Sequence, residues 1–134
     1  MILPNGATVA VADGETLKLF RNGAHEGAVA LSAVAAPELD GGNAGSGGRH
    51  RSSAGNPDDK TQAEDGFAAA SAAWLNTQVL GGKIAALMVI AAPRTLGELR
   101  KHYHKQLQAV LVGELAKDLV GHSVADIEAA VAAA

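Results

Sequence analysis

A glycine-rich, basic segment is the part of this sequence whose residue types best suit binding or chemistry. Residues 45–53 read GSGGRHRSS. Glycine lets the backbone approach a ligand and expose its N–H groups, and positive side chains suit phosphate or a nucleic-acid backbone. The candidate ligand- or RNA-binding residues here are Gly47, Gly48, Arg49, His50 and Arg51. The alternative, which composition alone favours, is a solvated loop whose arginines maintain solubility.

A second basic run covers residues 94–105, RTLGELRKHYHK. Its cations are Arg94, Arg100, Lys101 and Lys105. The only acid in the run is Glu98, so the run has an excess of positive charge. The first three cations join the candidate binding residues as an anion-binding face. The alternative is the solvated side of an amphipathic helix, which is the commoner origin of such a run.

Other kinds of site find little support in the sequence. The glycine-rich segment lacks the Gly-Lys-Ser/Thr of a Walker A loop, and no G-x-G-x-x-G joins a strand to a helix. No serine lies in a G-x-S-x-G elbow, so catalytic residues stay unknown. His102 and His104 are two residues apart, which on a helix separates them by about 200°. The sequence therefore predicts no metal site and no cofactor.

Composition bounds the class of protein. The chain has 134 residues, which is about one domain (1–134). Apolar residues make up 48% but aromatic residues only 3%, so the core must consist of Ala, Val, Leu and Ile. Scarce aromatics argue against a base-stacking platform, which needs exposed rings. With no cysteine, disulfides and thiolate metal ligands are excluded.

Charge and hydropathy address partners and location. The formal net charge of -3 shows that the whole molecule is not a binder of polyanions. No apolar run approaches the roughly 18 residues that span a bilayer, so no membrane partner is predicted. Residues 1–6 (MILPNG) contain no basic n-region and no sustained apolar run. We therefore expect no signal peptide and a cytoplasmic location. Oligomeric state is not indicated.

The first third of the chain resembles an antiparallel meander. Apolar and β-branched residues predict strands at 7–12, 15–21 and 29–35. Asp13-Gly14 between the first two predicts a hairpin with a two-residue type I′ turn. Residues 40–59 then contain six glycines and almost no apolar side chain. Such a segment cannot pack a core, and long loops of this kind are functional or disordered.

Helices alternate with strands in the second half. Thr61 and Glu64 have the spacing of a capping box, which predicts a helix starting near Thr61 and stopping at Gly81-Gly82. The apolar run 84–92 predicts a strand buried on both faces. A second capping box, Thr95 with Glu98, predicts another helix after Pro93.

The last predicted elements follow from apolar spacing. The apolar stripe of the helix after Pro93 is Leu96, Leu99, Tyr103 and Leu107. Residues 109–115 are predicted as a strand, and Ser123 opens a last short helix with Val124, Ile127 and Val131 apolar. The predicted fold class is α/β: a mixed sheet of about five strands flanked by about three helices, in the order βββ-loop-αβαβα.

Several stretches resemble the family of bacterial host-attachment proteins. They are residues 2–4 with 9–14, residues 45–50, residues 91–100 and residues 113–119. That family is similar to the middle domain of archaeal and eukaryotic peptide-chain release factors and of Pelota. In release factors the corresponding loop carries Gly-Gly-Gln and enters the peptidyl-transferase centre. Here Gly47 and Gly48 match the two glycines, and Arg49 stands where the glutamine would be.

The resemblance implies three functions that the residues leave open. The first is a ribosome- or RNA-binding protein, with ribosome or tRNA as partner. The second is a hydrolase of peptidyl-tRNA or another ester, which the missing glutamine disfavours. The third is a protein-interaction module that acts indirectly in attachment to host cells. Pelota has the fold without Gly-Gly-Gln, so the fold alone does not imply hydrolysis.

Overall fold

The computed structural model describes residues 2–24, 28–39 and 57–134. The elements run in the order β1 (Thr8–Ala12), β2 (Leu17–Asn22), β3 (Leu31–Val34), α1 (Pro57–Leu80), β4 (Leu87–Ala91), α2 (Pro93–Arg100), α3 (Lys105–Val110), β5 (Leu111–Ala116) and α4 (Val124–Ala133). The predicted α/β class is confirmed. The observed order of elements differs from the predicted order because the single helix expected after Pro93 is divided into α2 and α3.

The five strands form one mixed sheet in the order β3-β2-β1-β4-β5. Strand β1 pairs with β2 antiparallel and with β4 parallel, and β5 pairs with β4 parallel. Strand β3 is antiparallel to β2 and therefore runs in the direction of β1. Every residue of the central strands β1 and β4 is buried. The apolar run that predicted a strand buried on both faces is thus confirmed.

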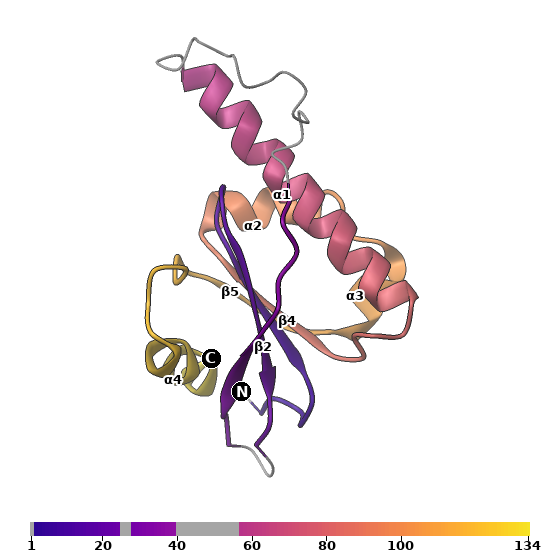
Figure 1. Ribbon diagram of the computed structural model, residues 1–134, viewed down its shortest axis with the longest axis vertical. Coiled ribbons are helices and arrows are strands. Elements are labelled where there is room, and N and C mark those ends of the chain that lie inside the picture. Colours follow the sequence, from indigo (N-terminus) through magenta and orange to yellow (C-terminus); the bar gives the residue numbers. More distant parts are fainter. Residues whose placement is uncertain (1, 25–27, 40–56) are drawn as a thin grey trace.

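Helices cover both faces of the sheet (Figure 1). Helices α1, α2 and α3 pack on one face, where Ala10 and Ala12 of β1 meet Phe67 and Leu75 of α1 in the same cluster. On the other face, Ile127 of α4 belongs to a second buried cluster, which also contains Leu119 and the β1 residues Val9 and Val11. Because side chains alternate along a strand, β1 directs its alanines to the first cluster and its valines to the second.

Helix α1 begins earlier than its capping-box spacing predicted. It starts at Pro57, so Thr61 and Glu64 lie inside the helix and the prediction of a start near Thr61 is wrong. Proline is favoured in the first helical turn, where its missing N–H costs nothing. The predicted stop is confirmed: Gly82 has a φ of 78°, and its N–H donates to the Val79 carbonyl at 3.0 Å.

The second helical region was predicted as one helix and is two. The capping box there is also wrong, since α2 begins at Pro93 after Ala92, whose side chain makes no capping hydrogen bond. Asn76 of α1 holds the break open: its Nδ2 donates to the His102 carbonyl at 2.8 Å, and its Oδ1 accepts from the His104 N–H at 2.9 Å. His104 then caps α3, its Nδ1 accepting from the Gln106 N–H at 2.9 Å. The two histidines therefore do not share a helix.

Helix α4 largely follows its prediction. Ser123 is the N-cap, and its hydroxyl accepts from the Asp126 N–H at 3.1 Å. Ile127 and Val131 are buried as expected. Val124 was expected in the same apolar stripe but is 38% exposed, because it occupies the first position of the helix.

Candidate functional site

Four of the five strands end at the same edge of the sheet. Strands β1, β3, β4 and β5 all run in one direction, so their carboxyl ends share this edge, called here the carboxyl edge. In α/β proteins, ligands bind in the crevice outside the carboxyl ends of the strands. The chain enters the glycine-rich segment after β3 and leaves it into α1, whose first turns extend beyond the sheet (Figure 1). The carboxyl end of β3 and the start of α1, the described elements on either side of the glycine-rich segment in sequence, thus lie at the carboxyl edge.

The hairpin between β1 and β2 forms part of this edge. The hairpin is confirmed, but its turn is not the two-residue type I′ turn that was predicted, since Ala12 pairs with Leu17. The Asp13 Oδ1 accepts from the N–H groups of Glu15 at 2.8 Å and Thr16 at 2.7 Å. The aspartate side chain thus supplies two of the turn's hydrogen bonds, and the Asp13 N–H donates a third to the Thr16 carbonyl at 3.0 Å. Gly14 does not have a positive φ.

Helix α1 lies directly against this turn. A Cβ at Gly14 would come within 2.5 Å of the Glu64 Cγ and 2.9 Å of its Cβ. Glycine is therefore required at position 14 for close approach. The contact fixes Glu64 at the carboxyl edge, close to the first residues of α2.

Arg94, one of the candidate binding residues, is engaged in this contact region. Its Nη2 lies 2.9 Å from the buried Oδ1 of Asp65, as an ion pair without hydrogen-bond alignment, and its Nη1 lies 4.0 Å from Glu64. The pairs join the first turn of α2 to α1. The Arg94 side chain remains 53% exposed, so it can still reach solvent at the carboxyl edge.

Arg100 and Lys101 lie at the opposite end of α2 from Arg94, away from the carboxyl edge. The Arg100 Nε and Nη2 donate to the Glu114 Oε1 at 3.0 and 2.8 Å, and this carboxylate raises the pKa of Arg100. Lys101 donates to the Glu98 Oε1 at 3.0 Å, a hydrogen bond that lowers the pKa of Glu98. Arg94, Arg100 and Lys101 thus each have a carboxylate partner.

Tyr103 joins the same carboxylate. Its hydroxyl donates to the Glu114 Oε2 at 3.4 Å, so Glu114 links the end of α2 and the following turn to the edge strand β5. Burial raises the pKa of the Tyr103 hydroxyl, and the charge of Glu114 raises it further. The folded state therefore disfavours the phenolate.

We expect Tyr103→Phe to change stability with a characteristic pH dependence. At pH 7 the change should stay within about 1 kcal/mol, because the lost hydrogen bond is long. Since the folded pKa is raised, the hydroxyl's contribution is complete below about pH 10, the ordinary tyrosine value, and is lost above it. The free energy of unfolding of the variant, measured with urea, should therefore rise relative to that of the wild type between pH 7 and pH 11.

The ionisation of the Tyr103 hydroxyl can also be measured directly. Tyr103 is the single tyrosine in the chain, so phenolate absorbance reports its ionisation alone. A folded protein that titrates at the ordinary tyrosine value would contradict the assignment.

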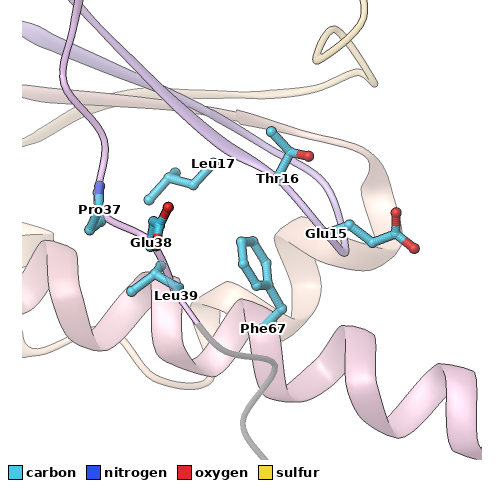
Figure 2. A pocket seen from close by; sticks show the side chains of 7 residues that line it. All are labelled: Glu15, Thr16, Leu17, Pro37, Glu38, Leu39 and Phe67. Atoms are coloured by element: carbon cyan, nitrogen blue, oxygen red, sulfur yellow. The ribbon is translucent and has the colours of Figure 1, made fainter. Parts of the chain in front are cut away.

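An open groove lies at the carboxyl edge beside the start of the glycine-rich segment (Figure 2). Its volume is about 560 Å³, and its lining comes from the β1–β2 turn, the segment after β3, and α1. The lining residues are Glu15, Thr16, Leu17, Pro37, Glu38, Leu39 and Phe67. Sequence reasoning missed this groove. The available signal was the pair of apolar residues in Pro37-Glu38-Leu39, just before a stretch with almost none.

The remaining predicted site residues lie outside the described residues. These are Gly47, Gly48, Arg49, His50 and Arg51. Across residues 2–24, 28–39 and 57–134, no three His, Asp or Glu side chains gather in a way that could hold a metal ion. The same ranges contain no helix long and apolar enough to cross a membrane.

Comparison with known proteins identifies the family. A search of curated proteins found no match to the chain. The family model described as "Bacterial archaeo-eukaryotic release factor family 12" matches residues 6–131. The match begins just before β1, ends within α4 and includes the sequence of the glycine-rich segment. The release-factor relationship predicted from the sequence is thereby confirmed, and the chain belongs to bacterial archaeo-eukaryotic release factor family 12.

Proposed function

We propose that this protein binds RNA, in the ribosome or in tRNA, through its glycine-rich basic segment. The observation that carries the proposal is the match to a release-factor family over residues 6–131. In this proposal Gly47 and Gly48 let the backbone approach the phosphates, while Arg49, His50 and Arg51 supply positive charge.

The charges on α2 support giving the main role to the segment rather than to the helix. Arg94, Arg100 and Lys101 each have a carboxylate at 3.0 Å or less. A cation that already has such a partner gains less from a phosphate, because the new contact must replace the old one. We therefore assign these three residues a secondary, supporting role in RNA binding, with Arg94 the one of them at the carboxyl edge.

The test is co-sedimentation of the protein with ribosomes across a salt series. The wild type should bind at low salt and lose binding as salt rises, because each neutralised phosphate releases counterions. The double variant Arg49→Ala with Arg51→Ala should bind at least about tenfold more weakly. Its log–log salt slope should fall by about 1.5, corresponding to two lost phosphate contacts.

A matched control removes the same charge elsewhere. Arg21 and Lys83 are both exposed and lie toward the edge of the sheet opposite to the carboxyl edge. Arg21 pairs with Thr8, the first residue of β1, and Lys83 precedes β4 in the chain. The double variant Arg21→Ala with Lys83→Ala should retain wild-type binding. Equal loss in both variants would show a general charge effect and would overturn the assigned site.

Two further assays on the same purified protein distinguish RNA binding from the other candidate functions. Capture of a protein partner that survives nuclease treatment would favour an interaction module over RNA binding. Turnover of peptidyl-tRNA on ribosomes would favour a hydrolase, in which backbone N–H groups near Gly47 and Gly48 stabilise the developing negative charge. Arg49 in the glutamine position makes binding without turnover the expected result.

A further inference from the structure

The groove at the carboxyl edge combines an apolar floor with acidic side chains. Leu17, Leu39 and Phe67 turn toward one another across it, and the Glu38 carboxylate rises between Leu17 and Leu39 (Figure 2). Glu15 stands at one end with its carboxylate directed outward. A groove of about 560 Å³ with this lining can accept one long side chain and its neighbouring backbone.

The pairing of the acids that line the groove determines which charge on a ligand the groove can accept. In the described part of the chain, neither Glu15 nor Glu38 has a cation within ion-pair distance. Acids on the neighbouring elements, such as Asp65 and Glu114, do have one. Unpaired carboxylates beside an apolar floor are complementary to a side chain that has an aliphatic stem and a cationic head.

The backbone at the groove is also available. Strand β3 is an edge strand whose pairing with β2 ends at Val34. Beyond it the chain continues through residues 36–39, for which no backbone hydrogen bond occurs within the described ranges. Free backbone groups next to a sheet edge are where an extended peptide adds as a further strand.

From these three features we infer that the groove binds an arginine within an extended segment of a protein partner. The aliphatic stem of the arginine packs on Leu39 and Phe67, and its guanidinium bonds to the Glu38 carboxylate. Arginine fits better than lysine because its planar, weakly hydrated head packs against apolar surface while it pairs with a carboxylate. This inference is independent of RNA binding, since the groove is acidic and would repel phosphate.

The experiment is an NMR titration of the full-length, isotope-labelled protein with a capped pentapeptide. The peptide has arginine at its centre and valine and alanine on either side. Shift changes should concentrate at residues 15–17, 37–39 and 67. Replacing the arginine by citrulline, which is neutral and nearly the same shape, should weaken binding by about fivefold.

Variants of the protein connect the effect to the groove. Glu38→Gln should weaken binding of the arginine peptide by about fivefold and abolish the preference for arginine over citrulline. Asp118→Asn removes the same charge from an exposed position outside the groove and should leave binding unchanged. Leu39→Ala should weaken both peptides to a similar degree, because it removes apolar contact alone.

Three results would overturn the inference. Equal binding of the arginine and citrulline peptides would remove the role of Glu38. Shift changes away from the groove would remove the site. Binding that appears only in the variant with Arg49→Ala and Arg51→Ala would show that the chain's own arginines occupy the groove, so that the partner assignment fails. None of these results depends on ribosome binding, so failure here is distinguishable from failure of the proposed function.

Discussion

Asn22→Ala should destabilise the folded protein by about 3 kcal/mol or more. The side chain is 1% exposed, and both ends of its amide are occupied. Its Nδ2 donates to the carbonyls of Leu3 at 3.0 Å and Pro4 at 3.2 Å. Its Oδ1 accepts from the N–H groups of Ala24 at 3.1 Å and Ala30 at 3.0 Å. Alanine would leave the Leu3 carbonyl and the N–H groups of Ala24 and Ala30 without this partner, at about 1 kcal/mol each, whereas the Pro4 carbonyl still accepts from the Ala7 N–H at 3.1 Å.

Urea unfolding of the variant and the wild type measures this loss, and Asn5→Ala is the matched control. Asn5 makes one exposed hydrogen bond, from its Nδ2 to the Ala24 carbonyl at 3.2 Å. Removing it should cost no more than about 0.5 kcal/mol, because water replaces an exposed bond. If both substitutions cost the same, the network around Asn22 does not hold the start of the chain to the sheet.

The central strands could be predicted because their sequence permits one environment. The run 84–92 contains apolar residues on both faces, and such a run is stable only between two layers of helices. The observed strand, Leu87–Ala91, is fully buried. Its neighbour β1 is also apolar throughout apart from Thr8. Local composition was therefore sufficient to place the core of the sheet.

Helix starts were harder to predict because two local signals competed. Both capping-box spacings were real patterns, yet each helix begins at a proline upstream, Pro57 or Pro93. Proline fixes φ near the helical value and removes a donor that would otherwise need a partner. Where a proline precedes a Thr-x-x-Glu pattern by a few residues, the proline is the better predictor of the first turn.

The break between α2 and α3 depends on a residue far away in the sequence. Asn76 satisfies backbone groups of residues 26 and 28 positions later. No periodicity within the run 94–105 contains that information. The apolar stripe continued across the break, since Leu99 and Leu107 are both buried, and it was therefore interpreted as one helix.

The candidate site shows the same limit. Of the carboxylate partners, only Glu98 lies close enough in sequence to Lys101, at i,i+3, to be anticipated. Arg94 pairs with Asp65 and Arg100 with Glu114, which the fold brings together. The groove likewise combines Glu15, Glu38 and Phe67 from three elements. Charge counts along the run 94–105 therefore could not predict which carboxylates Arg94 and Arg100 contact.

Ile127→Ala should detach α4 from the sheet and cost about 3 kcal/mol, within the range for a buried isoleucine cut to alanine. Ile127 and Val131 are the two buried side chains of this helix, and both are fully covered. Its polar anchor is a hydrogen bond from the Leu31 N–H to the Glu128 Oε2 at 2.7 Å. With one apolar contact removed, local opening of α4 should precede global unfolding.

Amide hydrogen exchange distinguishes this local loss from general destabilisation. In Ile127→Ala, amides of α4 should exchange much faster, while those of β4 should keep more of their protection because β4 is covered on its other face by α1 and α2. Val124→Ala on the same helix is the control; it removes a 38% exposed side chain and should cost no more than about 0.5 kcal/mol. Uniform loss of protection across the chain would instead mean that α4 is inseparable from the core, and that the face formed by Val9, Val11 and Ile90 cannot remain folded without it.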